Sequence, residues 1–138
     1  MDTKLKEEPR KTRYSDEELA EFKEIILAKL EVARNEYNRM MSVLTGKAGN
    51  DVADTSPTFK VLEEGSVTQE KEELTTLCAR QQRFIRDLQQ ALVRIENKTY
   101  GICRVTGKLI PKERLRAVPH ATLTIEAKEM LRKKNQNN

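Results

Sequence analysis

Apolar residues recur every three or four positions along two long stretches of the chain, and this pattern predicts two helices with narrow apolar seams. The first helix is expected to begin at Ser15. The run Ser15-Asp-Glu-Glu18 has the form of a capping box, in which the serine oxygen accepts an orphan backbone N–H and the glutamate reaches back. The pattern stops at Gly46 and Gly49. The seam positions are Leu19, Phe22, Ile26, Leu30, Ala33, Tyr37, Met40 and Leu44.

The second helix is predicted from about Ser66 to Lys98, with Ser66 and Gln69 as a second possible capping box and Gly101 as its end. Its seam follows a strict heptad spacing. Gln81 is polar within this seam, and a single buried polar group can fix the register of a coiled coil, although it could also reach solvent. The seam positions are Leu74, Leu77, Gln81, Phe84, Leu88, Ala91 and Ile95.

The stretch between these helices has no apolar periodicity and is punctuated by glycines and Pro57. A connector of this length lets two helices of roughly 45 Å, at 1.5 Å per residue, fold back antiparallel. The predicted fold is therefore all-α, a long coiled-coil hairpin followed by a small C-terminal region. The expected divisions are a disordered basic tail at 1–14, the hairpin at 15–98 with a tip loop at about 46–67, and the C-terminal region at 99–138, ending in a helix at 121–134.

Composition agrees with long solvated helices and a small core, since 35% of residues are charged and 4% are aromatic. The net charge of +4 is modest, and no sustained basic face of the kind typical of sequence-specific DNA binders is evident. No apolar run approaches the ~20 residues that span a bilayer, and no signal peptide is recognisable. Two distant cysteines fit a reducing cytoplasm, where we expect the protein to act as a monomer.

The C-terminal region has the layout of a small zinc finger, with two knuckles separated by about seventeen residues. A four-cysteine site would need cysteines at 103, 106, 124 and 127, and the chain has Cys103, Thr106, Thr124 and Ala127. Joining His120 to Cys103 would still give only two ligands. We therefore expect no zinc here, and small and apolar side chains in the place of the metal.

No catalytic constellation is present in the sequence, so an enzyme is not expected. The single histidine, His120, has no Asp or Asn placed to orient a dyad with a cysteine. Cys78 flanks the second seam, where packing is its expected role. The remaining chemical feature is the acidic pair Asp51 and Asp54 in the connector, which a hairpin would carry at its far end, where carboxylates could contact basic residues or Mg²⁺-coordinating groups of a large partner.

The order of these features resembles the DksA/TraR family, bacterial regulators that bind RNA polymerase and insert a coiled coil into its secondary channel. The resemblance spans about residues 15–130. It is carried by Leu19-Ala-x-Phe22, Tyr100-Gly-Ile-Cys103, Thr106-Gly107, and the run Arg114-Leu115-x-Ala117-x-Pro119-x-Ala121-x-Leu123.

The resemblance implies functional residues at the hairpin tip. The family's tip motif is Asp-x-x-Asp-x-Ala, which Asp51 and Asp54 match, while Ser56 stands at the alanine position. About nine extra residues follow before the second helix. In this family the tip reaches toward the catalytic region of the polymerase.

The resemblance also implies a nucleotide ligand. In this family ppGpp binds between the zinc-finger region and the polymerase during the stringent response. Of its basic positions Lys128 matches, whereas the others fall at Asp87 and Val118. Losing two cations argues against strong ppGpp binding in this mode. Lys128 and Arg114 remain as possible nucleotide or polymerase contacts.

The sequence therefore predicts a zinc-free, non-enzymatic regulator that binds RNA polymerase and modulates transcription initiation. The alternative is a helical-hairpin adaptor that scaffolds other proteins without acting on polymerase. A third reading is a nucleic-acid binder that uses its basic ends.

Overall fold

The computed structural model describes residues 12–46 and 57–136, with side chains outside 57–67. Its helices are α2 (Asp16–Thr45), α3 (Pro57–Glu96), α4 (Lys112–Ala117) and α5 (Ile125–Gln136). In this described part the only β pairing is an isolated antiparallel bridge between Ile102 and Leu109. The all-α fold predicted from the periodicity is confirmed.

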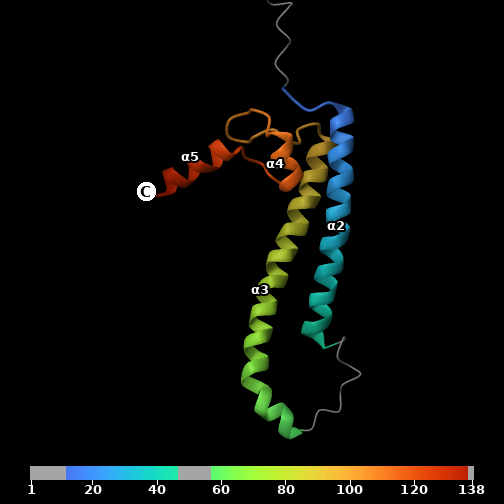
Figure 1. Ribbon diagram of the computed structural model, residues 1–138, viewed down its shortest axis with the longest axis vertical. Helices are drawn as coiled ribbons and strands as arrows, with labels where there is room; N and C mark the ends of the chain where they lie inside the picture. Colours follow the sequence, from blue (N-terminus) through green and yellow to red (C-terminus); the bar gives the residue numbers. More distant parts are fainter. Residues whose placement is uncertain (1–11, 47–56, 137–138) are drawn as a thin grey trace, which may run out of the picture. The chain divides into compact units, whose positions relative to one another are not determined.

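Figure 1 shows the four helices along the chain. The chain divides into two compact units, and α2 and α3 contribute to both. The terminal unit combines Met1–Ala28 with Leu88–Asn138, and the middle unit is Lys29–Asp87. Within the middle unit the two helices run antiparallel, because Ala33 contacts Gln81 while Leu44 lies near Leu74. Within the terminal unit, the start of α2 lies against the end of α3. Tyr14, just before α2, contacts Ile110 in the segment that follows α3.

The start and end of α2 follow the sequence signals. The Ser15 hydroxyl accepts the Glu18 backbone N–H at 3.1 Å, and the Glu18 carboxylate accepts the Ser15 N–H at 2.9 Å, which confirms the capping box. The helix ends at Thr45, and Gly46 takes the left-handed conformation with φ of 78°. Glycine adopts this conformation without steric cost, so it ends the helix as predicted.

The start of α3 differs from the prediction. The helix begins at Pro57, nine residues before the predicted Ser66, so the tip loop is shorter than 46–67 and Ser66 with Gln69 is no capping box. Proline suits the first helical position, because the N–H that it lacks would have no helical partner there. Gly65 costs a helix interior only about 1 kcal/mol relative to alanine. Pro57 and Gly65, which the sequence pattern placed in a loop, are therefore compatible with a helix at these positions.

The end of α3 is a Schellman motif rather than a glycine stop. The Thr99 N–H donates to the Arg94 carbonyl at 2.9 Å, and the Lys98 N–H donates to the Ile95 carbonyl at 3.1 Å. Lys98 itself holds the left-handed conformation, with φ of 65°. Gly101, the predicted terminator, lies beyond this motif and has a different role, described below.

Burial confirms most of the predicted seam and changes one part of it. Leu19, Phe22, Ile26, Leu30 and Ala33 of α2 are buried, as are Leu88, Ala91 and Ile95 of α3. Cys78 is buried, as expected for a packing role, whereas the neighbouring Leu77 is 45% exposed. A straight helix has 3.6 residues per turn, whereas a heptad pattern assumes 3.5. The buried position at this turn is therefore Cys78 and not the predicted Leu77.

Gln81 fixes a contact inside the middle unit. Its side-chain amide donates to the Ala33 backbone carbonyl at 3.1 Å, and the side chain is half-buried. Of the two possibilities left open by the sequence, a contact across the seam is the one observed. Such a bond favours one alignment of the two helices over its neighbours.

The C-terminal region holds two short helices where the sequence predicted one, at 121–134. The six-residue α4 carries the buried Leu115, and α5 begins at Ile125. Ile125 and Met130, two apolar residues of the last helix, are 62% and 59% exposed. Ala127 is the residue that α5 buries, because the first turn of α5 packs on the knuckle through its smallest side chain.

Candidate functional site

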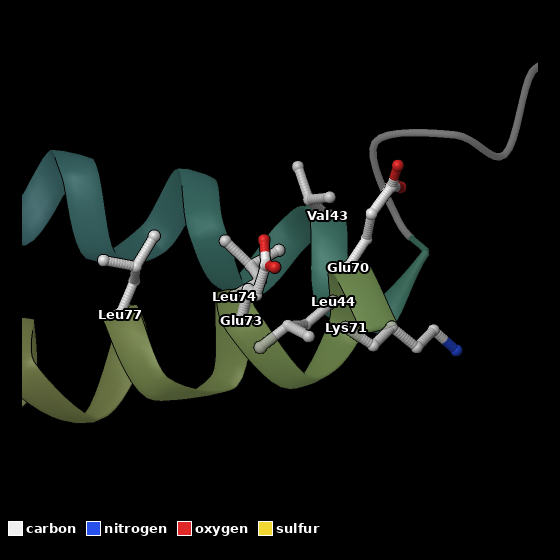
Figure 2. Close-up of a pocket in the computed structure, with 7 residues that line it drawn as sticks. All are labelled: Val43, Leu44, Glu70, Lys71, Glu73, Leu74 and Leu77. Carbon is white, nitrogen blue, oxygen red and sulfur yellow. The ribbon is translucent and has the colours of Figure 1, made fainter. Parts of the chain in front are cut away.

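The acidic tip predicted from the sequence, Asp51, Asp54 and Ser56, lies outside the described residues. In the middle unit, side chains near the end of α2 and from residues 70–77 of α3 line an open groove of about 370 Å³ (Figure 2). Its wall is apolar and its rim is charged. The residues are Val43, Leu44, Leu74 and Leu77 with Glu70, Lys71 and Glu73.

In the terminal unit, the first knuckle (residues 103–106) and the second knuckle (residues 124–127) meet around Cys103, which is only 1% exposed. Together with the segment between them they are called the knuckle. The backbone N–H of Thr106 donates to its sulfur at 3.5 Å, and that of Thr124 donates at 3.4 Å. The Thr124 hydroxyl lies 3.8 Å from the same sulfur. Two of the four predicted knuckle positions therefore contact Cys103 directly, and the structure brings both knuckles together.

Hydrogen bonding changes the chemistry of this thiol. Burial raises the pKa of Cys103, but hydrogen bonds from the Thr106 side chain and from the backbone N–H groups of Thr106, Thr124 and Val105 outweigh burial. The net result lowers the pKa to about 6. Donors that point at sulfur favour its charged form, so a thiolate is stabilised in the centre of the knuckle.

Thr124 has a second role that the sequence did not reveal. Its hydroxyl accepts the Ala127 backbone N–H at 3.1 Å and thereby caps the start of α5. Ala127, the fourth knuckle position, is fully buried beneath this cap. The spacing of Thr124 before a helical run was the available signal, since threonine is a favoured N-cap residue. The knuckle and α5 are thus joined through one side chain.

Two tyrosines anchor the knuckle to the long helices. The Tyr100 hydroxyl donates to the Pro119 carbonyl at 2.8 Å, and the Tyr14 hydroxyl donates to the Ile110 carbonyl. Phe22 packs between the two rings, with centroids 5.5 Å from Tyr14 and 5.3 Å from Tyr100. Burial raises the pKa of both tyrosines, so both hydroxyls stay protonated and act as donors.

Gly101 makes this arrangement possible. Its φ is 78°, and an added Cβ would lie 2.6 Å from Cε2 of Tyr14. Glycine is therefore required both for its backbone conformation and for the close approach of the ring. This explains the Tyr-Gly-x-Cys signature physically, because each residue in it holds one part of the knuckle.

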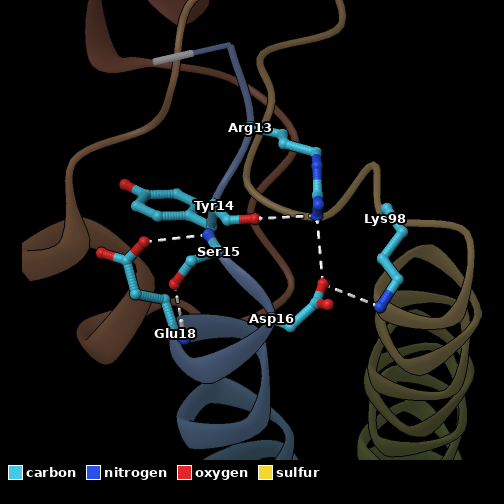
Figure 3. A network of polar contacts seen from close by, with 6 residues as sticks. All are labelled: Arg13, Tyr14, Ser15, Asp16, Glu18 and Lys98. Atoms are coloured by element: carbon cyan, nitrogen blue, oxygen red, sulfur yellow. Dashed lines mark hydrogen bonds and ion pairs between the residues drawn. The ribbon is translucent and has the colours of Figure 1, made fainter.

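A polar network surrounds the first turn of α2 (Figure 3). The Asp16 carboxylate accepts hydrogen bonds from Lys98 at 2.8 Å and from Arg13 at 3.2 Å, which lower the pKa of Asp16. Lys112 pairs with Glu18 at 2.6 Å, and this contact raises the pKa of Lys112. The network connects the segment before α2, the end of α3 and the start of α4 in one unit.

The two candidate contact residues of the C-terminal region lie differently. Arg114 is half-buried, and its Nε donates to the Leu123 carbonyl at 2.9 Å, which fixes the side chain against the second knuckle. Lys128 is exposed on α5. Arg114 also lines a groove of about 270 Å³ beside the start of α5, together with Lys108, Leu109, Pro111, Thr124, Ile125 and Glu126.

Neither a metal-binding cluster nor a membrane-spanning helix is found in the described ranges. Within residues 12–46 and 57–136, no three His, Cys, Asp or Glu side chains are grouped so that they could hold a metal ion. None of the helices in the described part of the chain is long and apolar enough to cross a membrane.

The chain is similar to known proteins in both sequence and structure. The chain is 36% identical over 117 residues to the RNA polymerase-binding transcription factor DksA of Caulobacter vibrioides, covering 83% of this chain and 76% of that protein. A 57-residue segment is 47% identical to the uncharacterized protein YteA of Bacillus subtilis, of which the chain spans 24%. The structure of transcription factor DksA2 from Pseudomonas aeruginosa has the same fold, with a TM-score of 0.76, 23% identity and 99% coverage of both chains.

A further match corrects the prediction about zinc. Residues 98–129 match the family model of the prokaryotic dksA/traR C4-type zinc finger, so the expectation of a zinc-free segment is contradicted. That expectation came from counting thiolates. Of the four ligand positions, the chain supplies one thiolate at Cys103, hydroxyls at Thr106 and Thr124 and no donor at Ala127, a set that does not fit a C4 site.

The identity to DksA covers 83% of the chain. The zinc-finger match covers the knuckle alone and agrees with it. The chain belongs to the DksA/TraR family.

Proposed function

We propose that this protein is a cytoplasmic, non-enzymatic regulator that binds RNA polymerase as a monomer and modulates transcription initiation. The observation that carries the proposal is the 36% identity to an RNA polymerase-binding transcription factor over 117 residues. The coiled-coil tip with Asp51, Asp54 and Ser56 would enter the secondary channel of the polymerase, and its carboxylates would alter the stability of the open complex.

The terminal unit suits the role of a docking base. Its polar network and its two tyrosine anchors hold the segment before α2, the end of α3 and the knuckle in fixed positions. A binding surface whose side chains are already held loses little conformational entropy on association. In this proposal the terminal unit grips the rim of the channel, and Arg114 and Lys128 are candidate polymerase contacts.

The residues at the family's nucleotide-binding positions also bear on ppGpp. Asp87 and Val118 stand where the family pattern has cations, and Asp87 is exposed. A carboxylate near a polyphosphate repels it, so regulation by this protein is expected to proceed without ppGpp. Titrating ppGpp into the initiation assay below tests this directly.

The experiment separates docking from regulation. The double variant Asp51→Asn, Asp54→Asn should keep its binding to purified core polymerase and lose its effect in an in vitro initiation assay at a promoter with a short-lived open complex. The matched control is Glu31→Gln, Glu72→Gln, which changes the charge equally at two exposed carboxylates of the middle unit.

Two outcomes contradict the proposal. Full regulation by the Asp51 and Asp54 double variant would exclude the tip mechanism. Failure of the unmodified protein to co-elute with core polymerase would exclude the target and favour the helical-hairpin adaptor instead.

A further inference from the structure

Positive charge is concentrated in the C-terminal region. Residues 97–136 contain ten lysines and arginines but only three glutamates, which gives this segment a formal charge of +7. The whole chain carries +4, so the remaining residues are net acidic. A surplus of this size within forty residues predicts a surface with positive potential, and such a surface attracts polyanions.

Four of these cations form a row that begins at the groove beside α5. Lys108 and Arg114 line this groove together with Thr124. Thr124 and Lys128 are joined by a helical hydrogen bond of 3.0 Å, so they are neighbours on the face of α5, and Arg132 follows at the same spacing. Successive members of this face are about 6 Å apart along the axis. We call Lys108, Arg114, Lys128 and Arg132 the cationic row.

The cationic row is available for an external partner. Two other lysines of the terminal unit, Lys98 and Lys112, pair with carboxylates of α2. Lys108 and Lys128 are exposed, and neither has an ion-pair partner among the residues that the structure describes. Arg132 pairs with Glu129 on the helix surface. A surface ion pair of this kind contributes little to stability, so Arg132 can leave Glu129 for another anion.

The geometry favours an extended polyanion over a small one. A free phosphate or nucleotide needs donors that converge on one point, whereas these cations extend from the segment before α4, through α4, to two successive turns of α5, and three of the four are exposed. The groove at the start of the row contains a single carboxylate, Glu126. Exposed cations set out over several turns suit the regularly spaced phosphates of duplex DNA, and contacts to phosphates carry no sequence information.

We propose that the cationic row binds the phosphate backbone of duplex DNA without reading its sequence. This goes beyond the proposed function, since it requires neither polymerase nor the acidic tip. Arg114 and Lys128 are also the candidate polymerase contacts, so duplex DNA and polymerase would compete for these two cations.

The test measures binding of the full chain to a fluorescein-labelled 30-base-pair duplex by anisotropy, at 50 to 200 mM KCl and with two unrelated sequences. Each phosphate contact contributes about 0.9 to the slope of log K against log salt, so four contacts predict a slope of about −3.6. Affinity should then fall about 150-fold over this range, and equally for both sequences.

The variant Lys108→Gln, Lys128→Gln, Arg132→Gln should reduce the slope to about −0.9, since one contact remains. The matched control is Arg80→Gln, Arg83→Gln, Arg86→Gln, which removes the same charge from exposed positions of α3 in the middle unit. The control should keep most of the slope. Far-UV circular dichroism of both variants shows that the helices are retained.

Three outcomes overturn the proposal. One is the absence of duplex binding by the unmodified protein at 50 mM KCl. Another is equal weakening by the control variant, because binding would then depend on net charge alone. The last is loss of polymerase binding with unchanged duplex binding in the Lys108, Lys128 and Arg132 variant, which would assign the row to a protein contact.

Discussion

Replacing Gly101 with alanine tests whether the close approach of Tyr14 holds the terminal unit together. The new Cβ would lie 2.6 Å and 2.7 Å from two ring carbons of Tyr14 and 3.1 Å from a methyl carbon of Leu115. The ring cannot easily move away, because its hydroxyl donates to the Ile110 carbonyl and the ring is 4% exposed. The backbone at 101 must also keep a φ of 78°.

Two costs add in this variant. Holding alanine in a left-handed conformation costs about 1 to 2 kcal/mol, and overpacking a filled core costs about 1 to 3 kcal/mol. The free energy of unfolding should therefore fall by about 2 to 5 kcal/mol. At roughly 4 °C per kcal/mol for a chain of this size, Tm should fall by about 8 to 20 °C.

Gly107 provides the matched control. Its φ is 73°, but nothing lies within 4 Å of a Cβ built there, so Gly107→Ala carries the backbone cost alone. Thermal unfolding followed by circular dichroism should place the Tm of Gly101→Ala clearly below that of Gly107→Ala. In a Tyr14→Ser background, where the ring is absent, the extra cost of Gly101→Ala should largely disappear.

Equal Tm values for the two glycine variants would refute the reasoning, because the contact with Tyr14 would then contribute nothing. An undiminished cost of Gly101→Ala in the Tyr14→Ser background would refute it as well. In either case the signature glycine would serve only the backbone conformation.

Two further predictions concern polar contacts. Gln81→Ala should lower the free energy of unfolding by about 1 kcal/mol, because the bond to the Ala33 carbonyl is lost, whereas the exposed Gln82→Ala should stay within about 0.5 kcal/mol in the same urea titration. Hydrogen bonds from Lys98 and then Arg13 lower the pKa of Asp16, so its contribution is present above the unfolded pKa near 3.8 and is lost as pH falls through the folded value. Asp16→Asn should therefore be less stable than the unmodified protein at pH 7, and the two melting curves should converge at strongly acidic pH; a constant gap would contradict this assignment.

Local signals in the sequence predicted much of the fold, because they depend on neighbours a few residues apart. The capping box at Ser15 and Glu18 and the glycine stop at Gly46 were both confirmed. The start of α3 was misplaced, because Pro57 and Gly65 were taken for loop residues although a helix tolerates both at those positions. Turn-forming residues are therefore ambiguous wherever a helix can begin.

The knuckle shows where counting ligands is insufficient. The four positions Cys103, Thr106, Thr124 and Ala127 were read as remnants of a metal site, and the zinc-finger match overturned the expectation of a zinc-free segment. The sequence did not reveal that Thr124 caps α5 or that hydrogen bonds lower the pKa of Cys103. The cap was nevertheless signalled locally by a threonine before a helical run. The lowered pKa depends in part on the backbone N–H of Thr124, which is distant along the chain from Cys103 and meets it only after folding.

By itself, the sequence determined the all-α class, the two helical seams and the family, since periodicity, caps and signature spacings are properties of the linear chain. Only the tertiary structure decided that Gln81 bonds to Ala33, that Tyr14 occupies the space beside Gly101, and that Lys108 and Arg114 meet at the start of α5. The first two of these contacts join residues far apart in sequence, and the third brings residues 108 and 114 to Thr124. Their geometry is set by packing, which a pattern of apolar and polar positions does not encode.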